Sequence, residues 1–435
     1  MCLDGVTTNS VDLSWAGNGQ QNGFAVQFRD SLNTGAWRYP LPIDDWPVAG
    51  TNWTENSDMF SQRYYRIQAV ERGGLRANAL VNSWSVFEIS LLYASSGISG
   101  VPENAVSMQK IEYETFDHRN QSSMASGSLF YPEGVASAPL LSWQHGTVCL
   151  DADAPSFGNS FDVAAGVYFA SQGYAVVMPD YLGLGDVSPG RHPYVHARSQ
   201  ALSAVDMIRA GRTYIDTQPL VLDGRLFLAG YSQGGQATMA LHRELEMFHS
   251  IEWPVTASAP MAGPYDLSDT MFNRILANTS YESPSYLAYL LLGYNEIYSL
   301  FDDPSEVFAM PYDSIIPPMF DGTNTCGEID AQLPSVPRDM LQPAFLSAVT
   351  NDVNHPFRAV LRVNDLYDWS PQSPVRLYHC AADSVVPIVN SVLARDAFLA
   401  NGVVDAALVD PSPSADHGDC AIPSVIAARI WFDSL

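Results

Sequence analysis

A glycine-flanked serine lies where an apolar strand pattern gives way to a helical pattern. The pentapeptide Gly230-Tyr231-Ser232-Gln233-Gly234 follows the apolar run at 226–229 and precedes a stretch over 235–248 whose apolar residues recur at three- and four-residue spacing. A serine turn between a strand and a helix is sharp, and side chains in place of the flanking glycines would collide with neighbouring backbone. The pattern in this context predicts a nucleophile elbow that exposes Ser232.

From about residue 105 the chain alternates between strand and helix patterns. Short apolar runs between turn signals predict strands at 110–116, 125–131, 140–143, 175–178, 225–229, 255–258, 375–378 and 406–409. Helical patterns such as 197–210 and 235–248 lie between the later strands. This alternation predicts an α/β fold with a mostly parallel eight-stranded sheet and helices on both faces.

The stretch between the strand predicted at 255–258 and the strand predicted at 375–378 is too long for a simple crossover connection. It runs from Ser258 to Val375 and contains an apolar, tyrosine-rich helical pattern over 286–301. We therefore expect a helical cap, inserted at about residues 264–370, over one end of the sheet.

Candidates for an acid and a base follow the serine along the chain. Asp383 comes just after the strand pattern at 375–378, and His417 lies in the loop after the pattern at 406–409. With this serine turn, the three residues of a triad occur in the order Ser, Asp or Glu, His. Because the carboxyl ends of parallel strands share one edge of a sheet, we predict Ser232 as nucleophile, His417 as general base and Asp383 as the acid that orients it.

Other histidines and one other aspartate compete for these roles. His379 falls within a strand pattern, and His242 and His249 fall within a helical one. Four more histidines precede the expected region, namely His118, His192, His196 and His355. Asp180 precedes the serine, so we interpret it as holding its own loop through an Asx-type hydrogen bond.

A third strand pattern leads into Gln144-His145-Gly146-Thr147. A glycine there lets the backbone come close to a bound carbonyl group. The backbone N–H groups of Thr147 and Gln233 are therefore candidate donors of an oxyanion hole, where each donor is worth on the order of 10²–10³ in turnover. We interpret His145 as a packing or loop-bracing residue rather than a catalytic one.

Several short motifs occur in one order along the chain. They are Ser-Trp-Gln-His-Gly-Thr at 142–147, Pro-Asp-Tyr-Leu-Gly-Leu-Gly at 179–185, His-Pro-Tyr at 192–194, Gly-Tyr-Ser-Gln-Gly-Gly at 230–235 and Asp-Ser-Val-Val-Pro at 383–387. With these motifs, residues 105–435 resemble the secretory lipase family of α/β-hydrolases. The resemblance implies a carboxylesterase or lipase with a helical cap, and it assigns the nucleophile to Ser232, the acid to Asp383 and the base to His417.

The cysteines fit a disulfide framework around this site. Cys380 lies three residues before Asp383, and Cys420 lies three residues after His417. If the triad forms, the two loops are neighbours, and a Cys380–Cys420 disulfide is geometrically reasonable. Cys149 and Cys326 are then the second expected pair, joining the oxyanion loop to the cap.

Residues 1–88 have a different pattern. Short alternating strands separated by Gly, Asn and Asp clusters predict a small all-β module. The module resembles a fibronectin type III domain, a departure from the lipase family that leaves the natural substrate open. Such modules act as spacers or as binders of a polymer or surface. The linker to the catalytic domain at 105–435 is expected at 95–102, a Gly/Ser/Pro cluster.

Composition limits the partners of the chain. Its 47 acidic and 21 basic residues give a formal charge of −26, which repels nucleic acid and anionic membrane surfaces and favours a neutral small-molecule, lipid or polymer ester. No Cys/His/carboxylate cluster has metal-ligand spacing, and no phosphate loop or dinucleotide fingerprint occurs, so we expect no metal and no cofactor.

The sequence also bears on localisation. No apolar run is long enough to span a bilayer. The chain begins at Met1-Cys2 directly before the all-β module, so we expect a secreted or cell-surface protein from which a signal segment has been removed. Cys2 is open to two interpretations, a lipoprotein anchor or an incidental cysteine.

Two other functions remain open from the sequence. A serine peptidase or amidase on the same fold uses the same triad and must also protonate an amine leaving group. A binding or adhesion protein built on an inactive hydrolase is the second alternative, although an intact nucleophile, acid and base argue against it.

Overall fold

The structure, a computed structural model, describes residues 74–119, 121–158 and 160–435, together with five strands of the N-terminal region. The chain divides into two compact units, one of residues 1–73 with 119–122 and one of residues 74–118 with 123–435. The strands of the first unit are β1 (Cys2–Val6), β2 (Ser10–Ser14), β3 (Phe24–Arg29), β4 (Asn52–Asn56) and β5 (Tyr64–Ala69). They pair as a three-stranded sheet, β1-β2-β4, and a two-stranded sheet, β3-β5. The remainder of the expected fibronectin type III-like sandwich falls largely on residues outside the described part.

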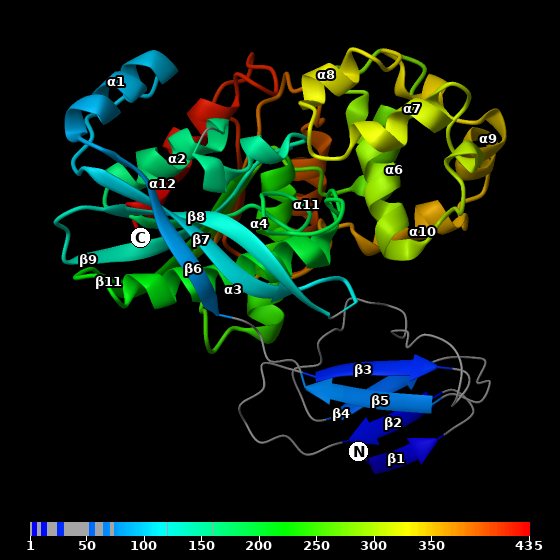
Figure 1. The fold of residues 1–435 in the computed structure, drawn as a ribbon, viewed down its shortest axis with the longest axis horizontal. Coiled ribbons are helices and arrows are strands. Elements are labelled where there is room, and N and C mark those ends of the chain that lie inside the picture. The colour runs from blue at the N-terminus through cyan, green and yellow to red at the C-terminus, as the bar shows by residue number, and fades with distance from the viewer. Residues whose placement is uncertain are drawn as a thin grey trace. The chain divides into compact units, whose positions relative to one another are not determined.

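The second unit is built on a nine-stranded sheet (Figure 1). Its strands are β6 (Leu75–Trp84), β7 (Val106–Phe116), β8 (Ser122–Pro132), β9 (Ser137–Gln144), β10 (Ala175–Pro179), β11 (Val221–Tyr231), β12 (Ala257–Met261), β13 (Val375–Tyr378) and β14 (Ala406–Val409). Their order is β14-β13-β12-β11-β9-β10-β8-β7-β6. The six strands from β14 to β10 are parallel, whereas β8 runs antiparallel to β10 and β6 antiparallel to β7.

The sheet corrects the expectation of eight strands. Each of the eight expected segments overlaps a strand, although β12 begins two residues after the expected start at 255, and β6 is the additional strand. It lies within the residues that the sequence placed in the N-terminal module, yet it pairs with β7 from Leu75 to Trp84. Helix α1 (Val86–Ser96) follows it, so the expected linker at 95–102 overlaps the end of a helix.

Helices cover both faces of the sheet because its central strands are apolar on both faces. On β11, Phe227 and Ala229 pack into a core with α1, α2 (Phe161–Ser171) and α12 (Ala421–Phe432). Leu226 and Leu228 point the other way, into a core with α3 (Ala197–Ile215) and α4 (Gln233–Phe248). Helix α11 (Val389–Ala400) packs on the second face with α4. This packing on both faces explains why residues 226–229 of β11 are an unbroken apolar run.

Helices α5 to α10 form the insertion between β12 and β13, which we call the cap (residues 262–374; yellow-green to orange in Figure 1). They are α5 (Phe272–Ile275), α6 (Ser285–Tyr298), α7 (Tyr312–Met319), α8 (Cys326–Asp330), α9 (Pro343–Asn351) and α10 (Pro356–Val363). The cap has its own apolar core, which also takes in Tyr194 and Val386 from the sheet's loops. The cap therefore packs against the edge of the sheet where the chemistry is expected.

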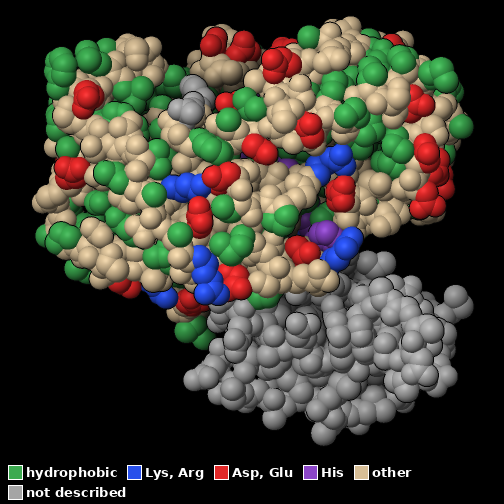
Figure 2. Space-filling view, viewed as in Figure 1, with side chains coloured by type: hydrophobic (Ala, Val, Ile, Leu, Met, Phe, Trp, Pro, Cys, Tyr) green, Lys and Arg blue, Asp and Glu red, His purple; other side chains and the backbone are tan. Residues whose placement is uncertain are grey.

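Acidic side chains are spread over the visible surface of the second unit, and basic ones are few (Figure 2). This distribution agrees with the formal charge of the chain. Among the helices that the structure describes, none is both long and apolar enough to cross a membrane.

Candidate active site

Ser232 lies in a strained turn between β11 and α4. Its backbone has φ 60° and ψ −120°, a conformation that residues with a side chain rarely adopt. The backbone approaches so closely that a Cβ on Gly230 would lie 2.5 Å from the carbonyl oxygen of Gln144, and one on Gly234 would lie 1.9 Å from the same atom. The two glycines are therefore required by the contact between β11, β9 and the start of α4.

The three residues predicted as a triad are connected by hydrogen bonds. The Ser232 hydroxyl lies 2.8 Å from Nε2 of His417, and Nδ1 of His417 lies 2.6 Å from Oδ2 of Asp383. The carboxylate accepts at Nδ1, so Nδ1 carries the proton and Nε2 is free to accept from the serine. The arrangement can remove a proton from Ser232 while it stabilises the imidazolium that results.

Asp383 is a buried carboxylate with four donors around it. Its Oδ1 accepts hydrogen bonds from the backbone N–H groups of Val385 and Val386, at 3.0 and 2.8 Å. Burial raises the pKa of this carboxyl, but the hydrogen bonds from His379 and His417 outweigh burial and lower the pKa from 3.8 to about 2. Asp383 is thus an anion throughout the pH range in which His417 acts as a base.

His379 is a functional neighbour that the sequence did not identify. Its ring is fully buried, with Nε2 2.8 Å from the carbonyl oxygen of Val386 and 3.2 Å from Oδ2 of Asp383, and Nδ1 2.7 Å from the hydroxyl of Ser391. The sequence places it at the end of a strand pattern, four residues before Asp383. That spacing is the only signal in the sequence that could have indicated the contact.

Two disulfides join loops around the site. Cys380 pairs with Cys420, with a Cα–Cα distance of 5.9 Å, and Cys149 pairs with Cys326. These are the two pairs expected from the sequence. The first connects the loop that carries Asp383 to the loop that carries His417, and the hydroxyl of Tyr231 adds a hydrogen bond of 2.5 Å to the carbonyl of His417.

Thr147 and Gln233, whose backbone N–H groups are the candidate donors, follow the carboxyl ends of β9 and β11, which are paired as parallel neighbours in the sheet. Within residues 74–119, 121–158 and 160–435, neither N–H has an intramolecular acceptor. The N–H of Gly146, one residue earlier, is instead bonded to Oδ2 of Asp162 at 3.2 Å. Of these two neighbouring N–H groups, that of Thr147 is therefore the one available to a ligand.

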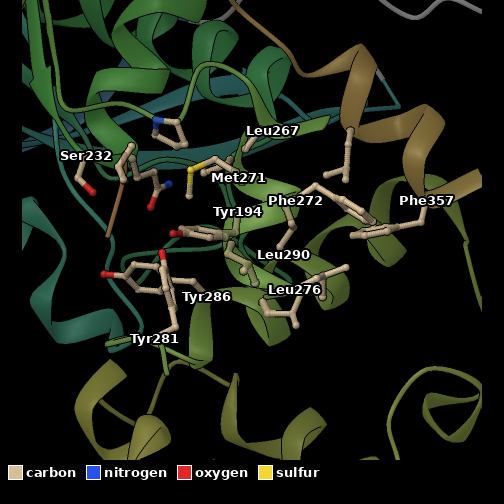
Figure 3. Close-up of a pocket in the computed structure, with 17 residues that line it drawn as sticks. Tyr194, Ser232, Leu267, Met271, Phe272, Leu276, Tyr281, Tyr286, Leu290 and Phe357 are labelled. Atoms are coloured by element: carbon tan, nitrogen blue, oxygen red, sulfur yellow. The ribbon is translucent and has the colours of Figure 1, made fainter. Parts of the chain in front are cut away.

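An apolar cavity begins at Ser232 and extends into the cap (Figure 3). Tyr194, Tyr281 and Tyr286 lie near the Ser232 end, and Phe357 lies at the opposite end. Its volume is about 50 Å³. Its further lining is aliphatic or aromatic for the most part, and includes Leu267, Met271, Phe272, Ile275, Leu276, Leu287, Leu290 and Leu361. The cavity suits an apolar group attached to a carbonyl at Ser232.

The chain is similar to known hydrolases. The model of the secretory lipase family matches residues 158–243. The rice cell wall degrading esterase LipA from Xanthomonas oryzae is 31% identical, with a TM-score of 0.72 over 83% of this chain and 95% of that chain. A protein of Legionella pneumophila assigned as a hydrolase is 28% identical, with a TM-score of 0.77 over 82% and 96%.

Candida antarctica lipase A in its closed state has the same fold, with 16% identity and a TM-score of 0.63 over 83% of this chain and 82% of that chain. No curated protein matches the chain by sequence.

Proposed function

Because this chain belongs to the α/β-hydrolase family of the Xanthomonas oryzae esterase LipA, and is on that basis an ester hydrolase, we propose that it cleaves neutral carboxylic esters through an acyl-enzyme on Ser232. The observation that carries the proposal is the continuous chain of hydrogen bonds from Ser232 through His417 to Asp383. A serine hydroxyl is a weak nucleophile unless a base is oriented to take its proton.

In the first half of the reaction, the Ser232 oxygen attacks the ester carbonyl carbon and its proton passes to Nε2 of His417. A tetrahedral oxyanion forms, and it collapses when His417 returns the proton to the leaving alcohol. In the second half, His417 takes a proton from water, which attacks the acyl-enzyme; His417 then returns the proton to the Ser232 oxygen as its bond to the acyl carbon breaks and the acid is released. Asp383 remains ionised throughout, because its pKa of about 2 lies far below neutral pH.

The oxyanion is stabilised by the N–H groups of Thr147 and Gln233. Both donors are free of intramolecular acceptors within the described residues, so no intramolecular hydrogen bond has to be broken when the charge develops. The Gln233 N–H also opens α4, and the positive end of that helix favours a negative charge there.

We further propose that the apolar cavity receives the acyl chain of the ester. The cavity is small, about 50 Å³, and is lined almost throughout by apolar side chains. Esters of short acids, on the scale of a butyrate, therefore fit without a movement of the cap. Charged acyl groups are disfavoured because the lining offers few polar partners.

Two findings indicate a secreted protein. The match to a secretory lipase model is one of them. The other is the pair of disulfides, because such bonds persist in oxidising compartments.

The test is hydrolysis of p-nitrophenyl butyrate by Ser232→Ala and His417→Ala, beside aminoacyl p-nitroanilides for amidase activity. We expect both variants to lose at least about 10³-fold in kcat and to fold normally. Ser258→Ala is a matched control, because Ser258 is fully buried on the adjacent strand β12 and its hydroxyl has no partner among the described residues. Turnover by Ser232→Ala close to that of Ser258→Ala would refute the proposal, and anilide cleavage faster than ester cleavage would replace it with an amidase.

A further inference from the structure

His145 is a fully buried histidine whose two ring nitrogens both face carbonyl oxygens. Nδ1 lies 2.7 Å from the carbonyl oxygen of Gly146, and Nε2 lies 3.1 Å from the carbonyl oxygen of Asp180. A carbonyl oxygen only accepts hydrogen bonds, whereas a neutral imidazole has one N–H donor and one lone pair. A neutral His145 would direct its lone pair at one of these oxygens, inside the protein and without a partner.

The surroundings of His145 favour a cation. Burial raises the pKa of the carboxyl groups of Asp162 and Asp180 on balance, and a positive charge on His145 acts in the opposite direction, lowering the pKa of each. The ring of Tyr181 stacks on His145 with centroids 4.2 Å apart, an arrangement that also favours an imidazolium. The ring therefore has two acceptors in its plane, an aromatic face against it and two carboxyl groups nearby.

The contact with Gly146 has a direct consequence for the oxyanion. The carbonyl of Gly146 and the N–H of Thr147 belong to the same peptide group. A charged donor on the carbonyl oxygen withdraws electron density through the amide and fixes its plane, so the N–H becomes a stronger and better oriented donor. We propose that His145, as an imidazolium, is the positioning residue that orients and polarises the Gly146–Thr147 peptide for the developing oxyanion. The inference rests on the proposed function of that peptide as an oxyanion donor.

Asp162 fixes the peptide on the other side of Gly146. Its Oδ2 accepts from the Gly146 N–H at 3.2 Å, and its Oδ1 accepts from Nε1 of Trp143 at 2.9 Å. One peptide is held by its N–H and the next by its carbonyl, so rotation of either is opposed. Of the N–H groups of Gly146 and Thr147, that of Thr147 then remains available to a ligand.

His192 provides an internal contrast. It stacks on Tyr181 at 5.7 Å, its Nδ1 lies 2.8 Å from the carbonyl oxygen of Leu182, and its Nε2 lies 2.8 Å from the side-chain amide of Gln233. One nitrogen faces an acceptor and the other faces a group that can donate, which a neutral ring satisfies. Burial lowers the pKa of His192 to about 3, in agreement with a neutral ring.

The charge state is tested on the wild-type enzyme by neutron diffraction from a deuterated crystal near neutral pD. We expect deuterium on both ring nitrogens of His145 and on Nδ1 alone of His192. A single deuterium on His145 would overturn the proposal, whether or not any variant folds.

The role in catalysis is tested with two substitutions that keep different donors. An asparagine places an amide near the position of Nδ1 and can still donate to the Gly146 carbonyl, whereas a glutamine places it near Nε2. We expect His145→Gln to lower kcat about 10- to 100-fold with KM changed less than about 2-fold, and His145→Asn to retain more of kcat than His145→Gln. The inhibition constant of a trifluoromethyl ketone, whose adduct carries an oxyanion, should rise in the same order, unlike that of the matched secondary alcohol.

The control is His242→Gln, which removes a fully buried histidine that contacts Glu246 on the same helix α4. It should lower stability without changing kcat. If His145→Gln behaves like His242→Gln while Ser232→Ala is inactive, the positioning role is refuted and the proposed function stands. If Ser232→Ala is active, the proposed function falls, whatever protonation the neutron map shows.

Discussion

Replacing both Cys380 and Cys420 by alanine should lower stability and activity together. Both residues are fully buried, one just after β13 and the other just before α12. Alanine is preferable to serine here, because a serine hydroxyl buried without a partner costs about 1–3 kcal/mol by itself. The double substitution then tests the covalent link with little added polarity.

The expected loss of stability follows from the length of chain that the bond closes. The two cysteines are 40 residues apart, and the chain-entropy relation gives about 4 kcal/mol for a loop of that length. A domain is typically stable by about 5–15 kcal/mol, so the variant should remain folded at 25 °C with a much lower urea midpoint. The Cys149–Cys326 bond spans 177 residues, and its removal should cost about 1 kcal/mol more.

The expected loss of activity follows from the position of the bond beside the triad. Each cysteine is three residues from a triad member, and two hydrogen bonds also tether the His417 loop, one from Tyr231 to the carbonyl of His417 and one from the Ala381 N–H to Asp410. The contact between His417 and Asp383 is short, at 2.6 Å, and a drift of about 1 Å in such a contact costs up to about 10² in rate. We expect kcat to fall about 10- to 100-fold with little change in KM.

The assay is hydrolysis of p-nitrophenyl butyrate at 25 °C, with urea unfolding measured on the same samples. Wild-type enzyme in enough urea to match the stability of the variant serves as the control for global destabilisation. Full activity of the variant would show that packing and Tyr231 hold the two loops without the bond. If thiol titration found both cysteines free in the oxidised wild type, the Cys380–Cys420 disulfide would not exist and the prediction would fail.

Three further outcomes are expected. Because Asp383 titrates at a pKa of about 2 when folded against an ordinary 3.8, its ionisation contributes about 2 kcal/mol of stability above pH 4 that is lost as the pH falls toward 2. The stability difference between wild type and Asp383→Asn in urea should therefore shrink over that range, and a constant difference would contradict the depressed pKa. Deleting residues 1–73 should preserve hydrolysis of soluble esters, whereas deleting 1–88 also removes β6, whose Trp84 packs on Phe130, and should lower Tm by several degrees; equal Tm values for the two truncations would argue against β6 as part of this unit. Leu290→Ala should enlarge the cavity and shift kcat/KM from p-nitrophenyl butyrate toward the octanoate, at a stability cost of about 2–5 kcal/mol; an unchanged ratio would place the acyl chain elsewhere.

The sequence predicted the candidate triad because each of its members follows a strand. Ser232, Asp383 and the loop of His417 come after β11, β13 and β14, and parallel strands bring their carboxyl ends to one edge. The expected order along the chain, serine, then acid, then histidine, left Ser232, Asp383 and His417 as the one combination. Such a prediction needs only the strands and their direction, and both can be inferred from apolar runs.

The edge strand β6 could not be recognised in the same way. Most of its residues are exposed, so it has no buried face, and its alternation of apolar and polar residues at 75–79 breaks at Leu80 and Val81. The start of α1 does carry a signal, the capping box of Ser85 and Glu88. Recognition of that motif would have indicated a helix before the expected linker.

The contacts of His145, His379 and Asp162 were beyond the sequence for a different reason. Each depends on which atom of a ring or carboxyl group faces which oxygen, and a strand pattern carries no such information. A histidine after a strand is equally compatible with a neutral packing residue and with a charged donor. Only the identity of the two acceptors, both of them carbonyl oxygens, separates these interpretations for His145.

Two residues with strained backbone conformations lie where strands of the site end. Each is held in place by hydrogen bonds or ring contacts with its neighbours. Ser232 after β11 and Tyr181 after β10 both have positive φ, at 60° and 69°, and such conformations cost about 1–3 kcal/mol each. Ser232 is held by its N–H on the carbonyl of Met261, and Tyr181 by its hydroxyl on the carbonyl of His145 and by its place between two histidine rings. The strain at Ser232 exposes the proposed nucleophile, and the strain at Tyr181 places an aromatic face against the proposed cation. The rigid sheet supports both conformations, so the geometry of the site is set by the core beneath it rather than by the loops alone.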